Sequence, residues 1–186
     1  MKREKTNTDL RTETVRPEKR SPDAGAENIR IRCGCAADDP EIEKILGVYF
    51  LDRDDIPAER FVLAECGGKI VGAASYDICE KAADKQTADE RNREKFGEIH
   101  TIAVLPSFKN KGIGKKLLDA LIGRPDLRCG GGHPETIYVR TTAPGFFRHM
   151  GFEDCPPDLK KELWDECRLC ETYAECAQKT LMLAIE

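Results

Sequence analysis

The middle of the chain combines a β-branched run, a loop with two glycines and an apolar helical pattern, in that order. Residues 98–104 are rich in isoleucine, threonine and valine, and Pro106 ends the run, which predicts a strand. The following loop carries Gly112 and Gly114, and it opens into a helical pattern whose apolar positions are Ile113, Leu117, Leu118, Leu121 and Ile122. Glycines let the backbone approach phosphates closely, and the N–H groups and dipole of a helix N-terminus favour an anion. This order predicts a pyrophosphate-binding site.

Two common phosphate-binding patterns do not fit this loop. The P-loop spacing Gly-x4-Gly-Lys-Ser/Thr is absent, and no third glycine follows Gly114 as it does in dinucleotide-binding loops. The loop instead resembles motif A of the GNAT N-acetyltransferases, Gln/Arg-x-x-Gly-x-Gly/Ala, which here is Lys109-x-x-Gly112-x-Gly114. Lysine at the first position keeps a cation near phosphate but lacks the planar fork of arginine. An ordinary amphipathic helix with a glycine at its start is the alternative.

Other segments agree with this resemblance. The GNAT pattern Ala-x-x-Phe-Tyr-x-x-x-Gly-Phe is matched by Ala143-Pro-Gly-Phe146-Phe147-Arg-His-Met-Gly151-Phe152. Upstream, two strand-like runs around a Gly-Gly pair at 67–68 predict a β-hairpin, after a first strand near 28–33 and a helix near 40–49. The resemblance covers about residues 28–152 and the last strand. It implies an α/β protein of the GNAT fold, with a central mixed, mostly antiparallel sheet of six to seven strands flanked by helices and a splay between strands 4 and 5.

Composition bounds the organisation of the chain. Its 186 residues predict one domain, at 28–186, after a polar and disordered tail at 1–27. The charged residues 80–96 predict a solvated insertion or polar helix. The net charge of −4 argues against nucleic acid as a partner. Because no apolar run approaches the ~18 residues of a membrane span and no secretory signal is seen, we expect a cytoplasmic protein that does not enter a membrane.

The resemblance implies acetyl-CoA as the cosubstrate. Main-chain groups of residues 102–104 are expected to pair with the pantetheine arm as a further strand, and the N–H groups of residues 111–115 to hold the pyrophosphate. The implied cofactor contacts are Ile102, Ala103, Val104, Lys109, Asn110, Lys111, Gly112, Ile113, Gly114 and Lys115.

An amine acceptor is protonated at neutral pH, so a base must remove its proton before it can attack. Glu98 is the first candidate, because relatives of this fold often carry a glutamate at that place. Simple strand alternation puts Glu98, His100 and Ile102 on one face, so His100 is the second candidate. Alternatively, Glu98 only begins a strand and His100 is a core histidine.

The leaving thiolate of CoA needs a proton or a hydrogen bond, and relatives often use the tyrosine of the Phe-Tyr pair. This chain has Phe147 at that position, which has no donor. Tyr138 and Tyr173 are possible substitutes that spacing does not favour. We therefore assign no general acid.

The acceptor is suggested by a finer resemblance. Residues 98–104, 139–142 and 146–152 look like the acetyltransferase domain of N-acetylglutamate synthases of the short kind, which lack an amino-acid-kinase domain. This resemblance implies an α-amino acid such as glutamate as the acceptor, in arginine biosynthesis. An acidic amino acid needs cations for its carboxylates, and Arg140 and Arg148 are the candidates by location, although surface or strand-end arginines explain them equally well.

Nine cysteines are many for this length, and the odd count favours reduced thiols over a disulfide framework. The segment 153–177, before the last strand, is cysteine-rich, and its Leu163-Trp164-x-x-Cys167-x-x-Cys170-x5-Cys176 pattern resembles the tails of small prokaryotic amino-acid acetyltransferases. Cys167 and Cys170 have metal-ligand spacing, Cys176 adds a third ligand, and Cys155 or the pair Cys33 and Cys35 a fourth. A structural zinc or iron–sulfur site is thus one hypothesis, and thiols that merely pack or respond to oxidants are the other.

Three functions stay open at this point. The first is an amino-acid N-acetyltransferase, which we favour. The second is an acetyltransferase of a protein N-terminus, a lysine, a polyamine or another small amine. The third is a non-catalytic CoA-binding sensor. A homodimer through exposed apolar residues near the last strand is a further possibility.

Overall fold

The computed structural model describes residues 28–80, 95–124 and 134–185, so the predicted tail 1–27 and most of the charged segment 80–96 lie outside the described residues. Seven strands form one sheet in the order β1-β2-β3-β4-β5-β7-β6. Only β4 and β5 run parallel, and the other neighbouring pairs are antiparallel. The strands are β1 (Ile29–Cys33), β2 (Phe61–Cys66), β3 (Lys69–Glu80), β4 (Lys95–Val104), β5 (Thr136–Thr141), β6 (Glu153–Asp154) and β7 (Lys179–Ala184). The predicted α/β fold with a mixed, mostly antiparallel sheet is confirmed.

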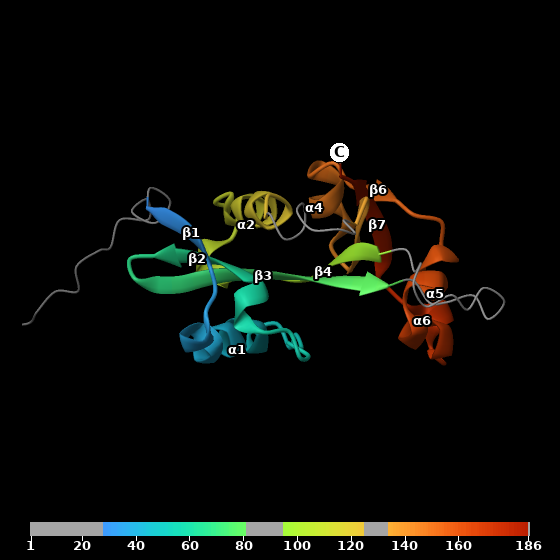
Figure 1. The fold of residues 1–186 in the computed structure, drawn as a ribbon, viewed down its shortest axis with the longest axis horizontal. Coiled ribbons are helices and arrows are strands. Elements are labelled where there is room, and N and C mark those ends of the chain that lie inside the picture. The colour runs from blue at the N-terminus through green and yellow to red at the C-terminus, as the bar shows by residue number, and fades with distance from the viewer. Residues whose placement is uncertain (1–27, 81–94, 125–133, 186) are drawn as a thin grey trace, which may run out of the picture.

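Helices cover both faces of this sheet (Figure 1). One face, which we call the α2 face, carries α2 (Ile113–Ile122) and α4 (Pro144–His149). The other, the α1 face, carries α1 (Asp39–Gly47) at one end and α5 (Leu159–Leu163) and α6 (Asp165–Leu169) at the other. Short 3-10 turns connect these elements at Ala36–Asp38, Ala58–Arg60, Pro106–Phe108 and Tyr173–Glu175. Among the described residues, the helices are too short or too polar for a membrane span.

The local sequence explains the elements that flank the site. Gly67 and Gly68 both adopt positive φ, of 57° and 76°, which is the backbone of a tight hairpin turn, and they join β2 to β3 as predicted. On α2 the apolar positions face the sheet, and Ile113, Leu117, Leu118 and Leu121 are at most 1% exposed. Burial of this apolar stripe fixes α2 over β3 and β4.

The strands β4 and β5 part after a short parallel contact. Gly97, Glu98 and Ile99 pair with Ile137, Tyr138 and Val139, and the pairing stops there. From His100 onward β4 keeps its ladder to β3 but has no strand on its other side within the described residues. This confirms the predicted splay between strands 4 and 5.

A β-bulge lies where the splay begins. Consecutive residues of β3 pair with Ile99 and Thr101, so His100 is an extra residue in β4. Simple alternation, which places Ile102 on the face of Glu98, is therefore wrong: the extra residue turns Ile102 to the α2 face, where it packs with Ile99. Glu98 pairs with Asp77 and Thr101 pairs with Ser75. Because Ser75 and Asp77 are two positions apart on β3, Glu98 and Thr101 share the α1 face.

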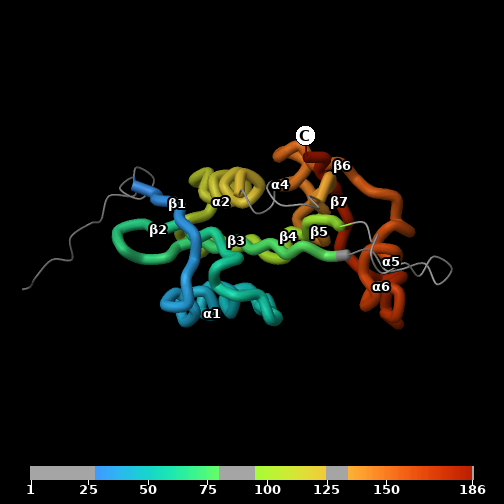
Figure 2. Tube along the Cα trace, viewed as in Figure 1, coloured from blue at the N-terminus to red at the C-terminus, as the bar shows by residue number. Residues whose placement is uncertain are grey.

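The cysteine-rich segment forms a lid over one end of the α1 face. Leu163 of α5, Cys167 of α6 and Trp164 between the two helices are buried against Phe96 of β4 and Tyr138 of β5. The Phe96 ring meets the Trp164 ring edge-on, with 6.1 Å between ring centroids. Figure 2 shows this segment at the end of the sheet away from α1. The lid leaves Glu98 only 6% exposed.

Candidate functional site

Beyond the splay, β4 offers main-chain groups that no described strand uses. The Leu105 N–H donates to the Val71 carbonyl of β3 at 2.9 Å. In an antiparallel ladder every second residue bonds to the neighbouring strand, so the N–H and C=O groups of Val104, the residue before Leu105, point away from β3. By the period of two, the groups of Ile102 point the same way, whereas those of Ala103 bond to β3. Of the three predicted contact residues on the strand, Ile102 therefore offers its N–H and C=O groups, and Val104 its N–H group, to an extended ligand, whereas the Val104 carbonyl accepts from Tyr49.

Tyr49, which the sequence analysis did not single out, lies at this edge. Its hydroxyl donates to the Val104 carbonyl, and the Lys109 Nζ lies 4.6 Å from the centre of its ring. The tyrosine thus connects the segment after α1 with both the strand edge and the first residue of motif A. No local pattern marks Tyr49, because the contact joins residues that are 55 positions apart.

The loop after β4 has the backbone that an anion site needs. Asn110 and Gly112 adopt positive φ, of 60° and 74°, on either side of Lys111. Alternation of left- and right-handed residues turns successive N–H groups toward one point. Among the described residues, the first turn-closing bond of α2 runs from the Lys116 N–H to the Gly112 carbonyl at 3.1 Å, so the earlier amides are available to an anion. The first turn of α2 carries no acidic side chain.

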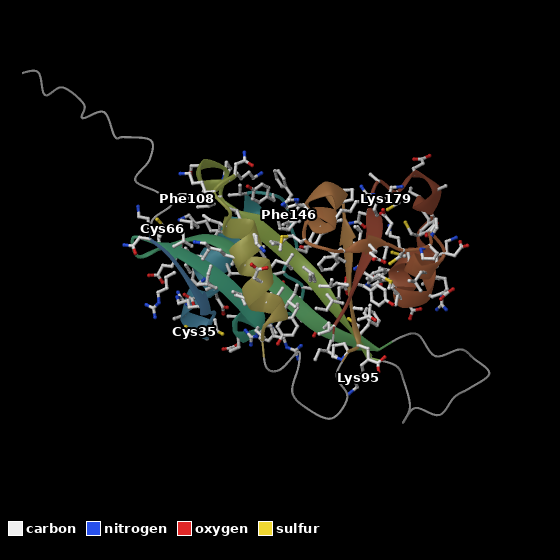
Figure 3. All side chains as sticks on the ribbon, turned by 90° about the horizontal axis from the view of Figure 1, so that it is seen from above. Cys35, Cys66, Lys95, Phe108, Phe146 and Lys179 are labelled. Carbon is white, nitrogen blue, oxygen red and sulfur yellow. The ribbon has the colours of Figure 1, made fainter. Side chains whose placement is uncertain are left out.

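The second glycine of the motif is enclosed by α4. A Cβ atom at Gly114 would lie 3.3 Å from the Phe146 ring, which is tighter than ordinary contact. Figure 3 shows Phe146 beside α2. The aromatic residue of the second predicted motif therefore packs on the start of the helix that the first motif opens, and this packing holds the amide cluster in place.

Glu98 is buried on the α1 face and accepts three hydrogen bonds from two residues. Its Oε1 accepts from the Arg140 Nη2 at 3.1 Å and Nε at 3.3 Å, and its Oε2 accepts from the Cys79 thiol at 3.6 Å. Burial, together with the Glu98 charge, raises the pKa of the Cys79 thiol to about 12, so the thiol stays a neutral donor. The structure therefore pairs the predicted base with a predicted substrate residue.

Arg140 also reaches the lid. Its Nη1 donates to the Glu166 Oε1 at 2.7 Å, and its guanidinium lies 4.6 Å from the centre of the Trp164 ring. Burial opposes the charge of this guanidinium, but the carboxylates of Glu98 and Glu166 outweigh burial and raise the pKa of Arg140. Arg140 is therefore a cation held between two carboxylates and an aromatic face.

His100 has a different acidic partner. Its Nε2 lies 2.7 Å from the Asp54 Oδ2, and its Nδ1 lies 3.3 Å from the Thr101 hydroxyl. Asp54 belongs to the segment after α1, so His100 turns to the α1 face like Glu98. The two candidate bases thus sit on adjoining parts of one strand, each with its own charged partner.

The remaining predicted residues lie away from this pair. Arg148 on α4 donates to Asp154 at 2.8 and 2.9 Å, and α4 covers the opposite face of the sheet (Figure 1), so the structure does not bring Arg148 to Glu98. Phe147 is a core residue at 2% exposure. Of the possible substitute acids, Tyr173 donates to the Pro157 carbonyl at 2.8 Å, and Tyr138 packs edge-on against Phe96.

The predicted metal site needs correction. Within residues 28–80, 95–124 and 134–185, no three Cys, His, Asp or Glu side chains are grouped so that they could hold a metal ion. The four predicted ligands instead have separate surroundings: Cys167 meets Arg140, Cys170 meets Thr172, Cys176 meets Lys160, and Cys155 is half-buried beside the lid. The spacing of the cysteines in the sequence would allow their thiols to reach one ion. In the folded chain, however, the short turns of the lid direct these thiols apart. Zinc and iron–sulfur are therefore unsupported.

A strand with a free edge, an amide cluster at the following helix and a buried carboxylate on the same strand are the features that the resemblance to motif A implies. Residues 28–152 match the Acetyltransferase (GNAT) family. The chain belongs to this family. The resemblance that the two motifs suggested is therefore confirmed at the level of the GNAT family.

Individual GNAT proteins agree with this assignment. The uncharacterized N-acetyltransferase CT2212 of Chlorobaculum tepidum is 29% identical over 86 residues, which are 44% of this chain and 51% of that protein. N-acetylglutamate synthase from Neisseria gonorrhoeae, complexed with coenzyme A and N-acetyl-glutamate, matches with a TM-score of 0.57 at 20% identity over 86% of this chain and 35% of its own. Arabidopsis thaliana Naa50, complexed with the bisubstrate analogue CoA-Ac-MVNAL, matches with a TM-score of 0.55 at 16% identity over 84% of this chain and 99% of its own.

These comparisons support the fold but do not identify the acceptor. This chain spans about half of the Chlorobaculum relative and about a third of the Neisseria synthase. The two solved GNAT structures differ in their bound ligands, an acetylated amino acid in one and a peptide analogue in the other. At these identities the likeness shows the shared GNAT fold.

Proposed function

We propose that this GNAT protein transfers the acetyl group of acetyl-CoA to the α-amino group of an amino acid such as glutamate. One observation carries the proposal: the free edge of β4 begins at His100, two residues after the buried Glu98, and leads to the amide cluster at α2. That path joins a place for a diphosphate, a place for an extended arm and a place for a base. The arrangement matches what acetyl transfer to an amine requires.

The chain's own groups fit acetyl-CoA along this path. The N–H and C=O groups of Ile102 and the N–H group of Val104 are free to bond the amides of the pantetheine arm, as a neighbouring strand does. The amides at the start of α2 face outward for the pyrophosphate, and four lysines between residues 109 and 116 add positive charge. The Tyr49 hydroxyl, at the Val104 carbonyl, keeps this part of the edge in position.

The reaction needs little more than positioning and a proton acceptor. The acceptor's ammonium gives one proton to the Glu98 carboxylate, or to His100 held by Asp54, directly or through water. The freed amine forms the new C–N bond at the thioester carbon, the C–S bond breaks, and the CoA thiolate takes up a proton. Arg140 keeps the Glu98 carboxylate oriented.

The charges around the site favour an amino acid as the acceptor. Glu98 and Arg140 are adjacent, with opposite charges 3.1 Å apart. An α-amino acid carries an ammonium and a carboxylate on the same carbon atom, so one zwitterion can face both side chains in a complementary way. The second candidate cation, Arg148, is engaged on the other face and is not needed for this arrangement.

The test is a panel of acceptors with acetyl-CoA, followed by the release of free CoA thiol. Glutamate and other amino acids, polyamines, peptides with free N-termini and lysine peptides are compared at equal concentration. Turnover with amino acids supports the proposal. Turnover with only peptides or polyamines selects the second function, and CoA binding without thiol release selects a sensor. A cytoplasmic location and a homodimer stay predictions that this panel does not address.

A further inference from the structure

Arg140 has one buried and one exposed carboxylate partner. Glu98 is 7% exposed at its side chain, whereas Glu166 is 64% exposed and stands on α6, a helix of five residues. The Arg140 side chain itself is 19% exposed. The contact with Glu98 is therefore part of the interior, and the contact with Glu166 lies at the boundary with solvent.

An ion pair with an exposed partner is weak and exchangeable. Pairs of this kind contribute little to stability, because water and salt compete with them and a long side chain must be ordered. Glu166 also sits on a short helix that is anchored mainly through Trp164 and Cys167 rather than through its own side chain. A carboxylate that arrives from solvent can thus replace Glu166 on the Nη1 atom of Arg140 without disturbing the Glu98 contact.

We propose that Glu166 occupies the place of the acceptor's carboxylate on Arg140 and thereby sets which amines the enzyme accepts. This inference rests on the proposed function, since it concerns the same acceptor site. Glu166 is a carboxylate bound to the guanidinium that lies beside the candidate base, which is where the carboxylate of an α-amino acid must lie if its amine is to reach Glu98. Glu166 therefore competes with acceptors that have a carboxylate next to the amine, and it does not compete with amines that lack one.

The two kinds of acceptor must respond oppositely when this competitor is removed. Glu166→Gln keeps the length of the side chain but removes its charge, so an α-amino acid no longer has to displace a carboxylate. An amine without an adjacent carboxylate gains nothing and loses an attractive negative charge near its path. A merely structural role of Glu166 would change the KM of both acceptors in the same direction.

The experiment compares L-glutamate with γ-aminobutanoate, the same molecule without the carboxylate beside the amine. We expect Glu166→Gln to lower the KM of L-glutamate about two- to fivefold with little change in kcat, which corresponds to an exposed ion pair. For γ-aminobutanoate the KM is expected not to fall. Glu162→Gln, on the neighbouring helix α5, removes the same charge from an exposed position of the lid and serves as the matched control; it is expected to leave both values unchanged.

Calorimetric titration of L-glutamate into the full chain saturated with CoA gives a second readout that does not depend on turnover. Tighter binding to the Glu166→Gln variant than to the unchanged chain supports the inference. Equal or weaker binding, or a KM that falls alike for both acceptors, overturns it. If the acceptor panel shows no acetylation of any amino acid, the proposed function fails; the titration still reports separately on the Arg140 subsite.

Discussion

The guanidinium of Arg140 spans the point where β4 and β5 part and places its Nη2 atom 3.1 Å from the Oε1 of Glu98. The two residues are 42 positions apart, and each stands on one of the diverging strands. Because this opening is where an acetyl-CoA arm would enter, the ion pair lies at the inner end of the proposed path. The chemistry of the site therefore depends on this pair, and most of the predictions below concern it or the path that leads to it.

Replacement of Glu98 by Gln tests the base. The amide cannot take a proton, so kcat for the best acceptor should fall about 10²- to 10⁴-fold, while CoA affinity measured by calorimetry should stay the same. Glu65→Gln, which alters another carboxylate in an ion pair with an arginine, is the control and should leave kcat unchanged. If Glu98→Gln keeps its kcat while His100→Gln loses it, the base is His100 and Glu98 only orients Arg140.

Gly112 tests the amide cluster. Its φ of 74° strains any residue with a Cβ atom, so Gly112→Ala should shift the loop and weaken CoA binding by about tenfold, which is about 1.4 kcal/mol. Gly67→Ala carries the same kind of strain in the β2–β3 turn, where no atom lies near an added Cβ. That control should lower the thermal stability without changing CoA affinity. Equal effects of both variants on affinity would show that the loop amides do not hold the diphosphate.

Tyr49 tests the strand edge. Tyr49→Phe removes the hydrogen bond to the Val104 carbonyl but keeps the ring under Lys109. The loss should cost about 1 kcal/mol of folding free energy, and the KM of acetyl-CoA should rise because this part of β4 is less well held. The outcome that contradicts this is an unchanged KM of acetyl-CoA in a variant whose stability has fallen, measured by steady-state kinetics and urea unfolding.

Cysteine labelling tests the Lys160–Cys176 contact. The Lys160 Nζ is 2.9 Å from the Cys176 Sγ, and this ammonium lowers the pKa of the exposed Cys176 thiol, whereas burial raises the pKa of Cys155 to about 11. At neutral pH iodoacetamide should therefore alkylate Cys176 faster than Cys155, as followed by mass spectrometry of peptides. Lys160→Met should slow the labelling of Cys176, and an unchanged rate would show that the ammonium does not activate this thiol.

Asp38 tests the acid sensitivity of the fold. Its carboxylate, 8% exposed, accepts two bonds of 2.7 Å from Arg32, and these bonds hold the pKa of Asp38 well below its usual range. Because the pKa of Asp38 is lower in the folded chain than in the unfolded chain, its ionised carboxylate stabilises the fold. This stabilisation is fully present at pH values above the unfolded pKa of about 3.9, and it is lost as the pH falls below that value toward the folded pKa. Asp38→Asn should cost about 1.5–3 kcal/mol near neutral pH, the range for hydrogen bonds to a charged group.

The pH dependence gives the sharper readout for Asp38. In urea unfolding at a series of pH values, the difference in stability between the unchanged chain and Asp38→Asn should shrink as the pH falls from about 5 toward 2. A difference that stays constant over this range would mean that the Asp38 carboxyl titrates alike in the folded and unfolded chains.

Local chemistry explains the parts of the fold and the site that the sequence could predict. The hairpin at residues 67–68 and the loop at Gly112 follow from glycine's freedom at positive φ, and both lie where the sequence placed them. The metal hypothesis is unsupported because it relied on spacing alone. The Cys167-x-x-Cys170 spacing indicates only that two thiols could reach one ion. In the structure, Arg140 approaches Cys167 and Lys160 approaches Cys176.

The sequence by itself determined the order of strand, loop and helix, the backbone of the anion site and the membership in the GNAT family, because all of these depend on residues close together in the chain. Only the tertiary structure decided which face each residue takes and which charge it meets. The bulge at His100 depends on its ladder with β3, and the contacts of Tyr49 with Val104 and of Arg140 with Glu98 join separate segments. Such partners are chosen by packing in three dimensions, which no local spacing encodes.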